Sequence, residues 1–527
     1  REFNETHILN SYAGAEVNSQ ERSSDWSEGW GMQYDNGELP FFDYLAFKRM
    51  RERNTNYYGV SNTVNRQIAF FATGTYSYKR RYTLTGTLRY EGSNRLGKAR
   101  SARWLPTWNV ATAWNMHEEE FFKKLQPAFS YLTLKASYSL TADAGPTWVT
   151  NSRVVINSYN PWRPSAGVAE SGLRISDLEN SSLTYEKKHE LNIGVDMGFL
   201  DNRINLAADW YKRNNFDLIG WTSTQGAGGQ VNRMGNVASM KSHGFEFTLS
   251  TKNIKNKGFE WSTDLIFGLS KTEVTELNTR SFMFALISGS GFTREGYPHR
   301  GLFSIPFVGL DEQGFPIFEI SDKNNEKVLV DKNNYGTLNF QEMEHLDFLK
   351  YEGPTDPTIT GSFGNIFSIK NWKLNVFVTY SAGNKVRLDP VFRSTYNDLD
   401  ATPKDFKNRW RVPGDEKRTN VPAISARRHH QLYSNLNLGY NAYNYSTVRV
   451  ADGGFVRMKE ISLTYSLPGS LLEGKLLKSA SIKVQATNLF LIYSDKKLNG
   501  QDPEFFRSGG VSAPVPKQFT CTLRLGF

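Results

Sequence analysis

The chain offers few residues that could carry out covalent chemistry. His117 is followed by three glutamates, but His-Glu-Glu-Glu-Phe lacks the second histidine of a His-Glu-x-x-His zinc site. His429 and His430 are adjacent, and neighbouring side chains on an extended segment point apart, which favours a solvated loop over a metal site. The single cysteine, Cys521, excludes an intrachain disulfide and a cysteine metal cluster. No nucleophile stands at a recognisable spacing from a base. We therefore predict no catalytic residue, no metal site, no cofactor and no enzyme activity.

Aromatic side chains in polar surroundings are the better candidates for function. Phe, Tyr and Trp make up 14% of the chain. Such rings, beside Asn, Arg and Asp, suit sugars, whose CH faces stack while their hydroxyls take hydrogen bonds, but they suit peptides and protein partners equally well. Packing of the loops on one another is an equally good explanation for any one of them. The candidate substrate-binding residues are Trp148, Tyr159, Trp162, Trp221, Trp410 and Tyr433.

Composition limits the class of protein. Lys and Arg number 63 and Asp and Glu 53, a net charge of +10, but no basic block is long enough to follow a phosphate backbone, so nucleic acid is disfavoured as a partner. No apolar run approaches the roughly 18 residues of a transmembrane helix. The abundance of aromatic residues argues against wholesale disorder. The chain is therefore expected to adopt an ordered fold. It is not expected to be a helical membrane protein.

Period-2 alternation is the strongest local signal. In 191–199 every odd position is a large apolar residue, and the even positions are Asn, Gly, Asp and Gly. Strand geometry sends these two sets to opposite faces of a sheet. After Asp201-Asn202 the alternation resumes in 204–211, so the two segments predict a β-hairpin.

Fourteen segments show this pattern and predict an all-β protein. They average about 12 residues, longer than the 5–6 usual in soluble sheets and close to what a tilted membrane strand needs. One of them, 453–467, loses its phase near Lys459-Glu460, which predicts a β-bulge. The segments are 6–17, 66–78, 82–92, 102–114, 131–140, 187–199, 203–213, 241–251, 258–274, 357–369, 373–384, 453–467, 479–490 and 517–527.

The gaps between these segments separate a membrane barrel from a soluble sandwich. Short gaps, such as 79–81 and 370–372, alternate with longer ones, such as 275–356 and 385–452. A soluble sandwich has no reason to place its long loops at one end, whereas outer-membrane barrels have short periplasmic turns and long extracellular loops. The alternation then places apolar residues toward lipid and polar residues toward a wet lumen. The last segment alternates up to a terminal aromatic residue, Phe527, as outer-membrane barrels do.

The segments and the residues around them resemble the SusC/RagA family of TonB-dependent outer-membrane transporters of Bacteroidetes. The similar stretches keep the family's order from about residue 66 to the C-terminus, although Glu91 stands where the family usually has Asp. They include Tyr76 to Tyr82, Arg89 to Ser93, Leu105 to Asn115, Tyr185 to Lys187, Asp209 to Lys212, Asn236-Val237, Asp356 to Thr358, Arg409-Trp410 with Pro413 to Asp415, Val456 to Lys459, Asn488 to Phe490 and Gln501 to Glu504.

The resemblance implies a transporter in the outer membrane of a Gram-negative bacterium. Its expected partners are a SusD-like surface lipoprotein, periplasmic TonB, outer-membrane lipid and an oligosaccharide substrate. An oligopeptide is the alternative substrate within the family, and a passive porin or a soluble adhesin is the alternative outside it. Transporter barrels of this type have 22 strands, eight more than the fourteen predicted here. We therefore expect 1–527 to be the C-terminal part of such a barrel, with plug, TonB box and N-terminal extension absent from this chain. Closure of fourteen strands by themselves is the alternative.

Overall fold

A computed structural model describes most of the chain, and the fold follows from it. The described residues are 2–3, 6–28, 32–33, 39–40, 44–52, 58–97, 99–126, 128–145, 155–159, 172–177, 179–223, 232–321, 324, 326–340, 345–392, 403–473, 476–508 and 516–527. Among them no helix is long and apolar enough to cross a membrane.

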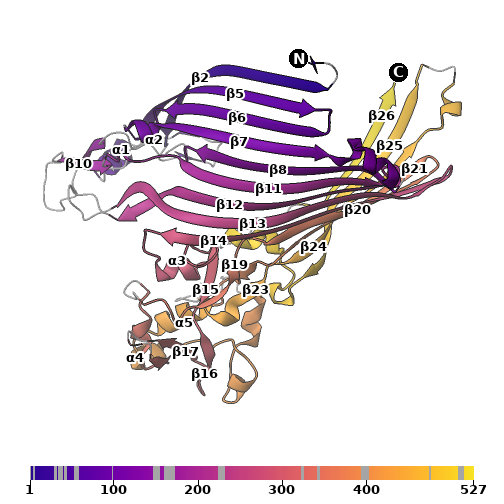
Figure 1. Cartoon of the computed structure of the whole chain (residues 1–527). Helices are drawn as coiled ribbons and strands as arrows, with labels where there is room; N and C mark the ends of the chain where they lie inside the picture. The colour runs from indigo at the N-terminus through magenta and orange to yellow at the C-terminus, as the bar shows by residue number, and fades with distance from the viewer. Residues whose placement is uncertain are drawn as a thin grey trace. The chain divides into compact units, whose positions relative to one another are not determined.

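One antiparallel sheet contains all fourteen predicted strands (Figure 1). Its hydrogen-bonded order is β1-β2-β5-β6-β7-β8-β11-β12-β13-β14-β20-β21-β24-β25-β26, so each long strand lies beside the next in the chain. The fourteen are β2 (His7–Ser27), β5 (Tyr58–Tyr78), β6 (Tyr82–Ser93), β7 (Trp104–Asn115), β8 (Phe129–Asp143), β11 (Glu186–Phe199), β12 (Ile204–Ser223), β13 (Asn232–Lys255), β14 (Phe259–Leu277), β20 (Ile359–Ile369), β21 (Trp372–Ala382), β24 (Phe455–Ser466), β25 (Ser479–Ser494) and β26 (Gln518–Gly526).

Several strands are longer than the segments in which polar and apolar residues alternate. β2 continues ten residues beyond the predicted 6–17, and β12 continues to Ser223. The added residues lie on the side of the long loops, where β2 and β5 stay paired as far as Ser27 with Tyr58. Alternation is needed only where one face meets lipid, so backbone pairing continues past the point at which the pattern stops.

The turns and the bulge are local and follow from the sequence. Leu200, Asp201 and Asn202 all have positive φ, from 53° to 60°, in the turn between β11 and β12. Asn and Asp tolerate this left-handed conformation better than most residues. The predicted bulge is confirmed, because Glu460 pairs with Phe377 and Met458 with Val378, which leaves Lys459 without a partner across the ladder.

The shorter strands and the α-helices lie outside these fourteen strands: β1 precedes β2 and pairs with it, and the others lie in the connections between the strands. They are β1 (Glu2–Phe3), β3 (Met32–Gln33), β4 (Leu39–Pro40), β9 (Val155–Tyr159), β10 (Gly172–Asp177), β15 (Gly301–Ser304), β16 (Phe307–Leu310), β17 (Pro316–Ser321), β18 (Lys327–Val330), β19 (Lys350–Pro354), β22 (Lys385–Arg387), β23 (Val450–Asp452), α1 (Tyr44–Glu52), α2 (Arg100–Arg103), α3 (Met283–Ile287), α4 (Arg427–Leu432) and α5 (Leu436–Asn444).

The chain divides into two compact units. The first comprises Arg1–Ala113, Ser137–Leu191 and Arg213–Ser239, and the second Trp114–Ala136, Asn192–Lys212 and Met240–Phe527. The first contains β2, β5 and β6 with parts of β7, β8 and β11 to β13. The second contains β14 to β26 and the two longest connections.

Polarity is inverted across the strands of the first unit. On β5 and β6 the apolar side chains of Phe70, Leu84 and Leu88 are exposed. Thr73 and Thr87, on the opposite face, are half-buried and bonded to each other at 3.2 Å. In water this arrangement would be unfavourable, because exposed apolar area costs about 25 cal/mol per Å². In a bilayer it is the expected arrangement for a spanning strand.

A row of aromatic rings crosses four neighbouring strands of the first unit. Trp108 of β7 contacts Tyr138 of β8 at 5.5 Å between ring centroids, and Tyr138 stacks on His189 of β11 at 5.7 Å. His189 in turn stacks on Phe216 of β12 at 5.5 Å. Such a row, level across strands, is typical of the aromatic girdle at a membrane interface.

Candidate functional site

The polar face of the sheet is a wall of paired hydrogen-bonding groups. On β5 and β6 a ladder of hydroxyls joins Thr75 to Thr85 at 3.1 Å, next to the Thr73–Thr87 pair. Beyond it the Arg89 guanidinium bridges Glu91 at 2.6 Å and Glu16 of β2 at 3.0 Å. These groups satisfy one another, so this part of the polar face is hydrophilic and its charged groups are paired.

The second unit repeats this arrangement on β21, β24 and β25. The Glu460 carboxylate accepts hydrogen bonds from Asn375 and Gln485, both at 3.2 Å, and lies 3.4 Å from the Lys483 ammonium. Lys135 of β8 pairs with Asp196 of β11 at 2.8 Å. Asp196, one of the polar even positions of 191–199, therefore lies among paired polar groups, as the alternation predicts.

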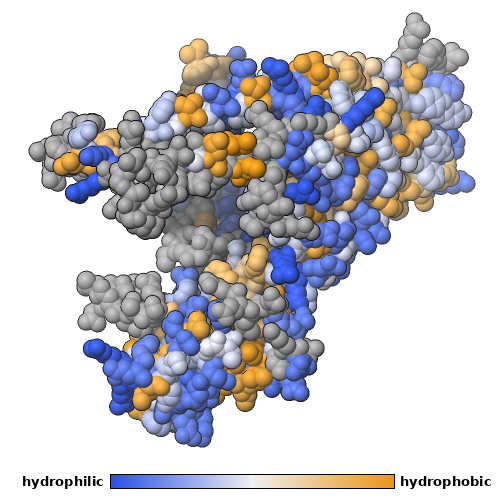
Figure 2. Space-filling model, turned by 90° about the vertical axis from the view of Figure 1, so that its left-hand side faces the viewer, coloured by the Kyte–Doolittle hydropathy of each residue, from blue (hydrophilic) through white to orange (hydrophobic). Residues whose placement is uncertain are grey.

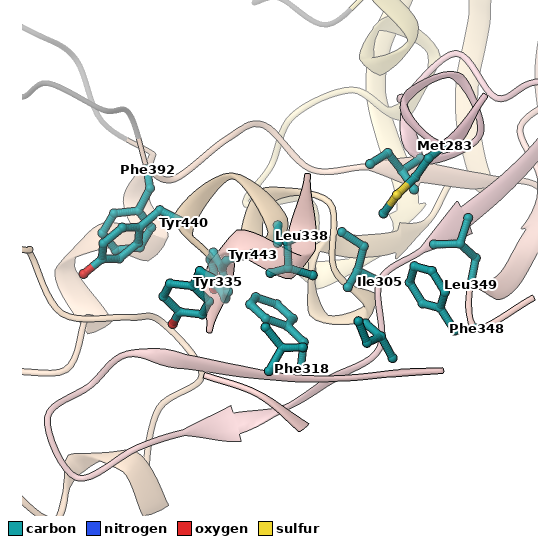
Figure 3. Packing of buried hydrophobic residues seen from close by; sticks show 14 of the residues in the cluster. Met283, Ile305, Phe318, Tyr335, Leu338, Phe348, Leu349, Phe392, Tyr440 and Tyr443 are labelled. Atoms are coloured by element: carbon teal, nitrogen blue, oxygen red, sulfur yellow. The ribbon is translucent and has the colours of Figure 1, made fainter. Parts of the chain in front are cut away.

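The two longest connections, 278–358 and 383–454, pack together into a folded body, here called the loop assembly. Its core contains aromatic and aliphatic side chains from both connections, including Ile305, Phe318, Tyr335, Leu338, Phe392 and Tyr443 (Figure 3). Most of its visible surface is hydrophilic (Figure 2, lower part). The loop assembly therefore has the polarity of a water-soluble domain.

A buried arginine joins the two connections. The Arg387 guanidinium donates to the backbone carbonyl oxygens of Ile287 at 3.3 Å, Phe303 at 2.6 Å and Ser446 at 2.9 Å, and to Ser304 Oγ at 3.1 Å. Burial lowers the pKa of Arg387 to about 9, so the side chain still carries its charge at neutral pH. Five fixed donors that satisfy several carbonyls at once are a property of arginine and not of lysine.

A buried ion pair fastens the connection between β25 and β26 to strand β24. Arg457 of β24 contacts both carboxylate oxygens of Asp502 at 2.6 Å, and Glu504 at 3.1 Å. The side chains of Arg457 and Asp502 are only 7% and 8% exposed. Two of the stretches that carry the family resemblance therefore meet in space, and their role is to hold the connection against the strand.

Asn236 has a comparable role in the first unit. Its side-chain oxygen accepts a hydrogen bond from the Thr184 backbone amide at 3.0 Å, and its amide group donates to the carbonyl oxygens of Thr184 at 2.9 Å and Asp217 at 2.5 Å. One side chain thus links β13 to the segment that leads into β11 and to β12. The residue types in this stretch are explained by structure, without a ligand.

The aromatic site candidates have different surroundings. The Trp410 ring is half-buried, lies close against Gly314, and its Nε1 donates to Glu416 at 3.1 Å. The Tyr433 and Phe315 rings pack together with their centroids 5.9 Å apart, and the Lys332 ammonium lies over the Tyr433 ring, 5.4 Å from its centroid. Both candidates therefore pack against the turn that contains Gly314 and Phe315.

The other candidates are placed only in part. Trp221 lies on the extension of β12 and not in a loop, and it is 51% exposed. Tyr159 ends β9, and its side chain lies outside the described residues, as do Trp148 and Trp162 altogether. The buried arginines that organise the loop assembly were not among the candidates. Arg457 lay within a stretch quoted for the family resemblance, but nothing in the sequence distinguished Arg387.

Comparison with known proteins identifies the family. A family model described as TonB dependent receptor-like, beta-barrel matches residues 2–450. The chain belongs to this family. The prediction of an all-β outer-membrane barrel is thereby confirmed.

Individual relatives of this TonB-dependent receptor barrel fit the SusC/RagA prediction. The chain is 25% identical to TonB-dependent receptor P39 of Formosa agariphila, over 97% of this chain and 50% of the relative. It is also 25% identical to TonB-dependent receptor SusC of Bacteroides thetaiotaomicron, over 90% of this chain and 44% of the relative. The chain thus spans about half the length of the curated relatives it matches.

A solved structure shares the fold. The structure of the RagAB peptide transporter matches with a TM-score of 0.75 and 21% identity, over 100% of this chain and 54% of that chain. The fold and the two curated relatives together confirm a SusC/RagA-like barrel in the outer membrane.

Proposed function

We propose that this chain forms the barrel part of an energy-coupled importer that takes up oligosaccharides across the outer membrane. The observation that carries the proposal is the inverted polarity of the strands, in a chain that belongs to the TonB dependent receptor-like barrels. Lipid would contact the apolar face, and solute would pass the hydrogen-bonded polar face. The chain is a transporter in this proposal, and it needs no catalytic residue, metal or cofactor.

Exposed aromatic side chains support oligosaccharide as the substrate. Trp221 presents about half of its surface, at the loop end of β12, where a sugar ring could stack on it. Tyr433 and Trp410 are proposed as further contacts through the ring faces that their packing leaves exposed. Trp148, Tyr159 and Trp162 complete the proposed set.

The partners of the importer are proposed by analogy with the family. A SusD-like surface lipoprotein would cover the loop side, and TonB would supply energy through a plug. That plug, the TonB box and about eight further strands are proposed to lie outside this chain, since 22-stranded transporters carry a plugged lumen. The proposal is supported by the chain's coverage of only about half of its relatives.

Uptake by whole cells tests the proposal. Cells with the full-length transporter and its partner would receive pools of short fluorescent oligosaccharides or peptides, with cells lacking the transporter as the control. Uptake of oligosaccharides that is lost when TonB is deleted is the expected result. Uptake that persists without TonB would establish a passive porin instead.

Oligopeptide import is the second candidate, and one observation favours it. The solved structure with the shared fold is described as a peptide transporter. Uptake of the peptide pool without the oligosaccharide pool would establish this candidate and overturn the first.

A further inference from the structure

A pocket of about 610 Å³ in the loop assembly is lined mainly by cationic and hydrogen-bonding side chains. All of its lining residues come from one stretch, 405–421. Four are cations, namely Lys407, Arg409, Arg411 and Arg418. Asn408, Thr419 and Asn420 add amide and hydroxyl groups, and Val421 adds one apolar contact. A volume in this range holds a sugar-sized ligand and not only a single small ion.

The two carboxylates of the pocket are already engaged. Asp405 pairs with Arg449 at 2.8 Å and accepts a hydrogen bond from Asn499 at 2.9 Å. Burial alone would raise the pKa of Asp405, but these bonds outweigh it and hold the pKa below its usual value. Asp415 accepts hydrogen bonds from the backbone amides of Arg411 at 3.0 Å and Val412 at 3.2 Å. Neither carboxylate neutralises a cation of the pocket.

The four cations are therefore not compensated from within the stretch. No ion pair of Lys407, Arg409, Arg411 or Arg418 occurs among the residues that the structure describes. The Arg411 guanidinium donates to the Lys407 carbonyl oxygen at 2.8 Å, and the Arg409 guanidinium to that of Phe406 at 3.3 Å. These bonds orient two guanidinium groups but leave their charge available.

The stretch that bears the cations is held closed by its own bonds. The Trp410 backbone amide donates to the Val421 carbonyl oxygen at 2.9 Å, and Thr419 Oγ1 donates to that of Asn408 at 2.6 Å. Gly414 turns the chain with a φ of 100°, which a residue with a side chain rarely adopts. The backbone that bears the cations is thus fixed, so little ordering of the chain would oppose binding.

We propose that this pocket binds a sulfate substituent of an oligosaccharide substrate. Planar guanidinium groups bind such oxyanions through paired, charge-assisted hydrogen bonds. The neighbouring Asn408, Thr419 and Asn420 suit the hydroxyls of the sugar that carries the anion. The inference rests on the proposed oligosaccharide import and narrows its substrate to acidic glycans.

The test measures binding to the full-length transporter, purified in detergent with its partner. The probes are short oligosaccharides from one mixture of sulfated polysaccharides, before and after chemical desulfation, and a pool of Asp- and Glu-rich peptides. The variant R411Q/R418Q removes two cations of the pocket. The variant R427Q/R428Q is the charge-matched control, because it removes two exposed arginines of α4 that do not line the pocket.

The sulfated pool should bind at least about 10-fold more tightly than the desulfated pool, since hydrogen bonds between guanidinium groups and oxyanions are among the strongest in proteins. R411Q/R418Q should remove most of this preference, and the control should keep it. Unchanged protease resistance of both variants would show that the loop assembly is folded.

Two results would overturn the inference. Equal binding of sulfated and desulfated sugars, or equal losses in the two variants, would refute the anionic site and leave oligosaccharide import standing. Binding of the acidic peptides through Arg411 and Arg418, without either sugar pool, would refute the sugar ligand together with the proposed substrate of the importer.

Discussion

The fourteen long strands, here called the strand wall, and the loop assembly are in contact with two different solvents. On β5 and β6 the large apolar side chains, such as Leu84 and Leu88, lie outside and the threonines face one another. In the loop assembly Phe303 and Phe318 are fully buried, and most of the visible surface is hydrophilic (Figure 2). The strands are stabilised in lipid by the face that would destabilise a soluble protein, while the loop assembly needs an ordinary hydrophobic core.

This contrast means that each region should respond to a different kind of substitution. A cavity should weaken the loop assembly and leave the strand wall intact. A charge on the outer face should weaken the strand wall and leave the loop assembly intact.

The largest effect is expected from Phe303→Ala in the loop assembly. Phe303 is fully buried and contacts the rings of Tyr297 at 4.9 Å and Tyr351 at 5.3 Å. Truncating a buried Phe costs about 3–5 kcal/mol. Trypsin should cleave the loop assembly of the variant at lower urea concentrations, while the barrel keeps its heat-sensitive migration on gels. Leu432→Ala, at a residue that is 72% exposed, is the control. Loss of the barrel itself would contradict the separation of the two regions.

The next effect concerns neighbouring residues on opposite faces of β25. Val484 is 55% exposed on the apolar face, whereas Gln485 donates to Glu460 on the polar face. Val484→Lys should lower the free energy of unfolding in phospholipid vesicles by about 2–4 kcal/mol. Gln485→Lys should change it little, because the ammonium would lie beside the Glu460 carboxylate. Equal losses in urea titrations of the two variants would reverse or reject the facing of the strands.

A smaller and more local effect is expected from Asn236→Ala. The change removes three hydrogen bonds that hold Thr184 and Asp217, and leaving buried groups without partners costs about 1–3 kcal/mol. Hydrogen exchange of the Thr184 amide should become faster. Asn232→Ala, on the exposed start of the same strand, is the matched control. Unaltered exchange at Thr184 would show that Asn236 does not secure this junction.

The strand wall could be predicted because its physics is periodic. A face that meets lipid imposes alternation at every second residue, so all fourteen strands and the irregularity at Lys459 were visible in the sequence. The continuation of β2 to Ser27 was not visible, because pairing outside the bilayer imposes no such pattern.

The loop assembly could not be predicted, because its contacts join positions far apart in the chain. Arg387 is defined by carbonyl groups of residues 287, 303 and 446, and no local pattern marks any of them. The surroundings of the aromatic candidates likewise depend on residues that are distant in the sequence. Whether Trp410 packs or stays exposed depends on Gly314, nearly a hundred residues earlier. The basic residues of 407–418 are interspersed with other types, so only the folded stretch gathers them into a pocket.

The smallest expected effect is a pH dependence where the two regions join. Asp495 follows β25, caps the next turn by accepting the Lys497 amide at 2.9 Å, and accepts the Asp452 amide at 2.8 Å. Burial alone would raise the pKa of Asp495, but these bonds and the nearby Lys497 and Lys385 bring it below the usual value. A carboxyl group with a lowered pKa in the folded state stabilises that state above its unfolded pKa, and this contribution is lost as pH falls through the folded pKa. The junction should therefore loosen only at pH values below about 4, by no more than the roughly 1 kcal/mol of a capping bond.

Asp495→Asn keeps the acceptor oxygen and removes the titration, so hydrogen exchange of the Lys497 amide should be less sensitive to acid in the variant than in the wild type. The same acid sensitivity in both proteins would assign the effect to another group.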